Sequence, residues 1–302
     1  MNESYGVAPS FEPKLTWSSL LAKTYQFYVQ HFWTLFQIGL PVALLAYLFW
    51  YGKHFFVQAL FNFLEKSFGP WWMTKLYLSW PVLTLLGFLE GVGYWVMSTV
   101  FFTAIAARIL KNGEEDAPIS DSYSPVRQRL GAVVVVGVLT WTVFWIARSI
   151  VMAAVSMLLE GFNVRVGSAT WYISSSAALL ILGGLCSRAG LAIPVLVNNA
   201  TMSPLKAIRG SIRKMENWEP FFIFFLAKSA LFGYGVYWLA QRAFAELWNR
   251  TPIDASAYSW VTWAVYICIA AALESPLFIA FSILYRELNA KQGEVITAPA
   301  IR

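Results

Sequence analysis

The chain has few charged residues and few side chains suited to acid–base or metal chemistry. Of its 302 residues only 13% are charged, with two histidines and two cysteines. In a soluble globular protein about a quarter of the residues are charged. The sequence contains no H-E-x-x-H, G-x-S-x-G, phosphate-loop or Cys-x-x-Cys motif. We therefore expect neither enzymatic activity nor a bound metal or other cofactor.

The scarce histidines and cysteines are also badly placed for a shared site. Cys186 and Cys268 both fall inside long apolar runs, where a free thiol behaves as a small buried hydrophobe. His31 and His54 flank the first apolar run at opposite ends, so a joint ligand cluster is not expected. The sequence predicts no disulfide and no metal centre.

Apolar residues dominate instead, at 58% of the chain. About 20 consecutive apolar residues are needed to cross roughly 30 Å of hydrocarbon. Six runs are long enough: Phe32–Tyr51, Val82–Ala107, Leu130–Leu158, Trp171–Val197, Phe221–Gln241 and Tyr258–Tyr285. The sequence predicts an all-α, polytopic membrane protein with six transmembrane helices. Residues 15–290 form this domain, between a loose tail at 1–14 and a C-terminal tail at 291–302.

The distribution of positive charge predicts the orientation. The net charge is +6, and we attribute it to topology rather than to nucleic-acid binding. Thirteen Lys and Arg residues fall in the tails and the second and fourth loops, against six in the odd-numbered loops. Cytoplasmic segments carry the excess of Lys and Arg. Both termini should therefore be cytoplasmic, in a protein of the plasma (inner) membrane.

The segment from Ser203 to Pro220 predicts a helix lying in the cytoplasmic membrane interface. Ser203 suits the N-cap position, and Pro204 suits the first helical position. Apolar residues recur at helical spacing, at Leu205, Ile208, Ile212 and Met215. Basic residues fill much of the remainder, at Lys206, Arg209, Arg213 and Lys214. An apolar stripe beside a basic face is typical of a helix bound at an anionic lipid surface.

We call such an interfacial helix before a span an elbow. Weaker versions of it precede the first and third predicted spans. Thr16 can cap a helix from Trp17 to about Gln30, and Ser124-Pro125 can begin a short helix. Elbow, outward span and returning span would then occur three times, starting near Thr16, Ser120 and Ser203. The fold is predicted as three hairpins with cytoplasmic amphipathic elbow helices, arising either by duplication or as an ordinary chain of helical hairpins.

Smaller features of the predicted spans concern helix breaks and packing. Pro41, Pro194 and Pro276 should kink or break their helices. Gly87 and Gly91 have the GxxxG spacing that permits close approach of two helices. The aromatic segment Phe55–Phe68 is expected to lie on the outer interface, after the first span.

Two stretches resemble a bacterial and archaeal membrane family. The first is the run around the elbow, matching at Pro194, Ser203, Ala207 and Ser211, with Asn199 where an acid is common. The second is the closing run Pro276–Leu288. The family includes the membrane domain associated with some glycerophosphodiester phosphodiesterases and stand-alone multi-pass relatives of unknown function. The resemblance implies a multi-helix membrane fold. It implies no phosphodiesterase activity, because this chain has no such domain.

Five ionisable residues fall inside the predicted spans: Glu90, Arg148, Arg188, Lys228 and Glu274. Such residues usually face the bundle interior and are paired. Counting depth along the spans places Glu90 with Arg148 on the outer side, and the other three near or below the midplane. They either hold helices together or line a polar cavity. With three cations against two acids, such a cavity would favour an anion.

Three hypotheses for function follow. The first is a non-enzymatic membrane protein that organises or senses membrane lipid, including anionic lipid, or assists another membrane protein. Its partner would then be a membrane protein or a second copy of this chain. The second is a small transporter or permease for an anionic solute or lipid, using Arg188, Lys228 and Glu274. The third is a membrane-embedded lipid enzyme. The basic elbows and the missing catalytic groups favour the first, and the broken helices favour the second.

Overall fold

A computed structural model describes residues 16–69, 80–111, 118–164, 168–215, 218, 220–228 and 275–291, with single positions 235, 239, 242, 246 and 268. Within these residues every regular element is a helix. The elements are α1 (Trp17–Gln30), α2 (Phe32–Phe68), α4 (Trp80–Lys111), α5 (Ile119–Ser122), α6 (Ser124–Gly161), α7 (Ala169–Cys186), the 3₁₀ turn η1 (Ser187–Ala189), α8 (Ala192–Asn198), α9 (Pro204–Lys214) and α12 (Ser275–Lys291).

Four segments of this helical chain are long and apolar enough to cross a membrane: Phe32–Phe49, Thr84–Leu110, Ile119–Gly161 and Thr170–Asn198. They overlap the first four predicted spans. The all-α prediction is thus confirmed for the described residues. Most of the fifth predicted span and much of the sixth lie outside those residues, as do the two predicted tails.

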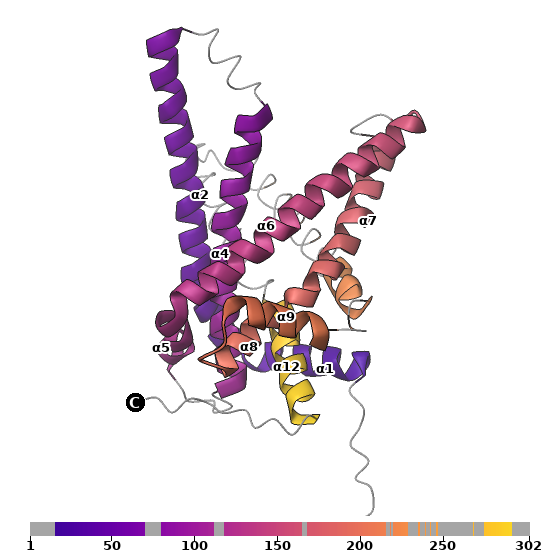
Figure 1. The fold of residues 1–302 in the computed structure, drawn as a ribbon. Helices are drawn as coiled ribbons and strands as arrows, with labels where there is room; N and C mark the ends of the chain where they lie inside the picture. Colours follow the sequence, from indigo (N-terminus) through magenta and orange to yellow (C-terminus); the bar gives the residue numbers. More distant parts are fainter. Residues whose placement is uncertain are drawn as a thin grey trace, which may run out of the picture.

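The first two hairpins form separate arms (Figure 1). Helix α2 contacts α4, and α6 contacts α7. The outer parts of the two arms diverge, whereas their inner ends meet the short helices (Figure 1). With 37 residues, α2 is about 55 Å long at 1.5 Å per residue. It continues through Phe68, so Phe55–Phe68 continues the helix of the first predicted span instead of opening a loop after it.

Helices α4 and α6 join the two arms through an aromatic seam. Trp95 stacks on Phe144, and its indole N–H donates to Thr140 at 2.9 Å. Gly91 touches the ring of Trp141, where an added Cβ would come within 1.8 Å of a ring carbon. Gly87 has no neighbouring heavy atom within 4 Å of that position. Only one glycine of the predicted GxxxG pair therefore makes a close contact.

The buried core lies at the inner end, where the returning helices meet. Phe102 of α4 stacks on Phe278 of α12, and Phe281 stacks on Phe222 at 4.1 Å between ring centroids. The whole of α8 from Ala192 to Val197 is buried among them. This packed inner end fixes the positions of the short helices that lie across it.

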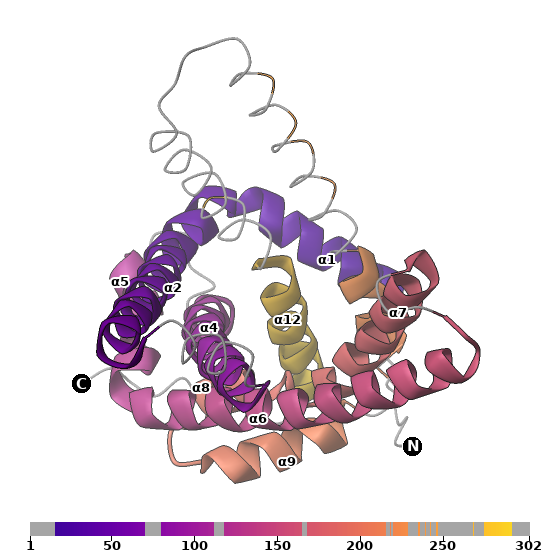
Figure 2. The same ribbon diagram turned by 90° about the horizontal axis from the view of Figure 1, so that it is seen from above.

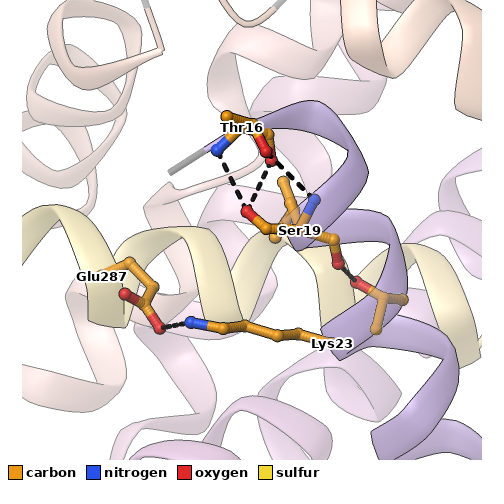
Figure 3. A network of polar contacts seen from close by, with 6 residues as sticks. Thr16, Ser19, Lys23 and Glu287 are labelled. Carbon is orange, nitrogen blue, oxygen red and sulfur yellow. Dashed lines mark hydrogen bonds and ion pairs between the residues drawn. The ribbon is translucent and has the colours of Figure 1, made fainter. Parts of the chain in front are cut away.

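Three of the short helices each contact a helix of the packed end: α5 contacts α4, α9 contacts α8, and α1 contacts α12. The third contact joins the two ends of the described chain. Lys23 of α1 donates to Glu287 of α12 at 2.7 Å (Figure 3). The start of α1 is as predicted, because Thr16 and Ser19 exchange capping hydrogen bonds there (Figure 3).

Candidate functional site

Helix α9 is the most amphipathic short element and forms as predicted, over Pro204–Lys214. Pro204 occupies the first turn, where the missing N–H costs nothing. Ser203 is at the N-cap position, but its side chain makes no capping hydrogen bond. The helix lies across the direction of α2 and α4 (Figure 1) and at the edge of the molecule (Figure 2). It therefore presents one side to the protein and one away from it.

The inward side of α9 consists of small residues. Ala207 and Ser211 are fully buried, one turn apart. Small side chains allow close approach, and α9 contacts both α8 and η1. The Ser211 hydroxyl accepts the N–H of Leu191 at 2.9 Å and donates to the carbonyl of Arg188. One side chain thus bonds backbone groups on both sides of a break in helical structure, between α7 and α8.

That interruption divides the fourth predicted span. Helix α7 ends at Cys186, η1 follows, and α8 begins at Ala192. Pro194 lies in the first turn of α8 and lacks an N–H, which is tolerated at a helix start but not inside a helix. A break frees backbone groups that need partners in an apolar setting. The Ser211 hydroxyl bonds two of these backbone groups, so α9 and the broken span form one unit.

Arg129 fixes the other end of α8. Its guanidinium donates to the carbonyls of Leu196 at 3.0 Å and Asn199 at 2.8 Å, and also to that of Met202. Leu196 lies in the last turn of α8, where carbonyls lack intrahelical partners and the helix dipole favours a cation, and Asn199 and Met202 follow that end. Arg129 itself leaves helical geometry, at φ −133° and ψ 28°, where the segment from Ser124 joins the long part of α6.

The outward side of α9 carries two apolar and three basic residues. Leu205 is 58% exposed and Ile212 is 42% exposed. Lys206, Arg209 and Arg213 are also exposed. The predicted apolar stripe is therefore divided: Met215 is buried against the protein and Ile208 is half-buried, whereas Leu205 and Ile212 face away. We call these five outward residues the α9 outer face.

Lys214, predicted as part of the basic elbow, points into the protein. Its ammonium donates to the side-chain oxygen of Asn289 at 2.7 Å and lies 5.5 Å from the centre of the Tyr285 ring. Tyr285 in turn accepts from Asn198 at 3.2 Å. Lys214 thus ties the end of α9 to α12 and α8. The cations available on the outer face are the remaining three.

Two members of the predicted intramembrane charge cluster lie beside the short helices. The backbone carbonyl of Arg188 bonds to α9, and its side chain is exposed. Lys228 is exposed as well, with its ammonium 5.0 Å from the centre of the Tyr25 ring in α1. Burial raises the pKa of nearby Tyr28, and Tyr25 raises it further. Glu274, which was predicted to lie near Arg188 and Lys228, is outside the described residues.

Glu90 and Arg148 do not form the expected pair. Trp141 donates to the carbonyl of Phe88, and Trp145 packs on the Phe88 ring, which sets the register of α6 against α4. Arg148 then lies toward the outer end of α4 from Phe88, and Glu90 lies on the inner side. The described residues contain no ion pair between them, and Arg148 is exposed.

Sequence reasoning missed the positioning roles of Arg129, Ser211 and Asn289. Arg129 was counted only as a loop cation, although its place five residues after Ser124-Pro125 puts it at the junction with a span. Asn289 is fully buried, and its side-chain nitrogen has no hydrogen-bond partner. Its position directly after the closing run Pro276–Leu288 was the available signal. No group of metal-ligating side chains occurs among the described residues.

The fold and the α9 outer face define an all-helical protein with four helices long and apolar enough to span a membrane, and with a basic amphipathic helix across one end. Comparisons with protein-family models, curated proteins and solved structures found no match to this chain. The family resemblance at Pro194, Ser203, Ala207 and Ser211 stays a prediction.

Proposed function

We propose that this protein is a non-enzymatic integral membrane protein that organises or senses lipid at the cytoplasmic leaflet, with α9 as the lipid-contacting element. One observation carries the proposal: α9 is fastened to the protein by Ser211 and Lys214, yet turns two aliphatic and three basic side chains outward. A face of this composition suits the boundary between acyl chains and anionic headgroups.

The energies of the two parts are comparable. A basic residue near an anionic leaflet contributes about 1 kcal/mol, so the three cations contribute about 3 kcal/mol. Complete burial of a Leu or Ile side chain contributes about 1.5–3 kcal/mol. Because Leu205 and Ile212 are each about half exposed, their burial adds a similar amount. Neither part alone dominates, so contact should respond to headgroup charge and to apolar insertion together.

The complete topology in this proposal is six spans arranged as three hairpins, with both termini in the cytoplasm of the plasma (inner) membrane. The excess of Lys and Arg in the predicted inner loops supports this orientation. Further support comes from the short helices, each of which contacts the returning helix of the preceding hairpin, with α1 on α12 closing the series. Three equivalent units would produce this pattern.

The lipid proposal is better supported than transport of an anion through a charged interior. A transport cavity would need Arg188 and Lys228 turned toward a common space. The Arg188 and Lys228 side chains are both exposed, and the Lys228 ammonium lies over the ring of Tyr25 in α1. Cations near the end of a span commonly reach toward the interface in this way. They add to the basic character of the inner surface.

Native mass spectrometry of gently extracted protein tests the proposal. The full chain should retain phosphatidylglycerol in preference to phosphatidylcholine, and Arg209→Gln with Arg213→Gln should remove most of that preference. The matched control is Lys66→Gln with Arg148→Gln, which removes two exposed cations from the arms and should leave the preference intact. Equal retention of both lipids by the unaltered protein would contradict the proposal.

A further inference from the structure

The three cations of the α9 outer face form one continuous ridge. Lys206, Arg209 and Arg213 follow one another at spacings of three and four residues. Side chains at these spacings are neighbours on a helix, with Cβ atoms about 5–6 Å apart. From Lys206 to Arg213 the ridge extends about 10 Å along the axis at 1.5 Å per residue. The ridge therefore covers two helical turns. This length exceeds what a single phosphate group can contact.

Nothing in the described part of the chain neutralises this ridge. No acidic residue occurs between Ser203 and Met215. The described structure gives none of the three side chains an ion pair or a hydrogen bond. Like charges at these spacings repel each other. A ligand with two negative groups one turn apart would relieve that repulsion at both contacts.

The ridge is also held in place before any ligand binds. Ser211 fixes the rotation of α9 about its axis, because its hydroxyl bonds Arg188 and Leu191. Lys214 fixes the C-terminal end through Asn289. A preorganised surface loses less conformational entropy on binding. Arginine adds geometry to charge, because its planar fork can donate two parallel hydrogen bonds to one phosphate.

We infer that the ridge binds a lipid whose headgroup joins two phosphates. Arg209 and Arg213 each donate hydrogen bonds to phosphate, and Lys206 adds a third positive charge. A three-carbon glycerol bridge holds two phosphates at a separation comparable with one helical turn. The acyl chains then lie against Leu205 and Ile212, beside the ridge. This inference rests on the proposed function and narrows it to one headgroup class. Because both phosphates belong to one molecule, translational and rotational entropy is lost only once on binding.

The test is a competition on the full chain in nanodiscs, read by native mass spectrometry. Diphosphatidylglycerol competes with phosphatidylglycerol at equal total phosphate, in a phosphatidylcholine background. The unaltered protein should retain diphosphatidylglycerol at least about tenfold better. Arg209→Lys with Arg213→Lys keeps the charge but removes the forks. This variant should lose most of that preference and still favour anionic over zwitterionic lipid.

The two proposals fail differently in this experiment. Equal retention of the two anionic lipids by the unaltered protein would overturn the two-phosphate inference and leave the lipid function standing. Unchanged selectivity in the lysine variant would overturn the role of the arginine forks. Loss of every anionic preference, with phosphatidylcholine retained as well as the others, would overturn both. Circular dichroism of each variant confirms that the helical fold is kept.

Discussion

Ser211 connects two helices that a broken span has separated. Its hydroxyl bonds the carbonyl of Arg188 before α8 and the N–H of Leu191 at the start of α8. The side chain is fully buried, so water cannot replace these bonds. The residue therefore serves two purposes: it completes the backbone bonding of the break, and it sets which side of α9 faces outward.

Substitution of Ser211 by alanine should destabilise the protein by about 1–3 kcal/mol, because two buried backbone groups lose their partner. Ser203 provides the control. It belongs to the same helix but makes no capping bond, so Ser203→Ala should change stability by less than about 0.5 kcal/mol. Thermal unfolding in detergent measures both. Equal losses would show that the Ser211 bridge contributes nothing specific.

The sequence predicts where the residues of α9 lie along the helix better than it predicts which way they face. Leu205, Ile212 and Met215 share an apolar character, yet Met215 is buried in the protein and the other two are exposed. A protein interior and a lipid boundary both favour apolar side chains, so hydrophobic periodicity cannot separate them. Small size was the better guide, since Ala207 and Ser211 mark the side that contacts the protein.

At the scale of elements, Gly91 makes the tightest glycine contact in the seam between α4 and α6. An added Cβ at Gly91 would lie 1.8 Å from a ring carbon of Trp141, whereas Gly87 has open space. We expect Gly91→Ala to cost about 1–3 kcal/mol, because the Trp141 ring must move. Gly87→Ala should stay within about 0.5 kcal/mol. Thermal unfolding distinguishes them, and equal effects would contradict the seam.

The starts of α1 and α9 are as predicted, whereas the described residues contain no ion pair between Glu90 and Arg148. Thr16 makes a capping hydrogen bond and Pro204 suits the first helical turn, and both effects act within one turn. Glu90 and Arg148 were paired by counting along predicted spans, which assumes that every span begins at one level. Helix α6 begins at Ser124, before the predicted span, and is bent at Arg129. The contacts of Trp141 and Trp145 with Phe88 set the register, and in that register Arg148 and Glu90 lie on opposite sides of Phe88 along α4.

At the scale of the whole molecule, the proposed six-span topology would place the connection between α6 and α7 opposite α9 across the membrane. A single cysteine at Glu160 should react with an impermeant maleimide in intact cells. A cysteine at Arg213 should react only after the membrane is opened. Both are exposed positions, and Cys186 and Cys268 are first replaced by alanine. Labelling of both from the same side would contradict this topology.

Closure of the short helices around the inner end was partly predictable. The three elbows repeat a local pattern of a capping residue followed by an amphipathic turn, which the sequence displays. The contact between α1 and α12 joins positions more than 250 residues apart, at Lys23 and Glu287. An exposed ion pair of this kind contributes at most about 1 kcal/mol. Its sequence signal is correspondingly weak, and only the fold brings the two residues together.

A nitroxide scan along α9, in the full chain reconstituted in anionic bilayers, tests the central claim most directly. Labels at Leu205 and Ile212 should collide more with oxygen, which concentrates in lipid, than with a water-soluble nickel complex. Labels at Lys206 and Arg209 should show the reverse, and a label at Ala207 should be immobile with little access to either. Water-like accessibility at Leu205 and Ile212, or immobility equal to that at Ala207, would contradict a lipid-facing α9.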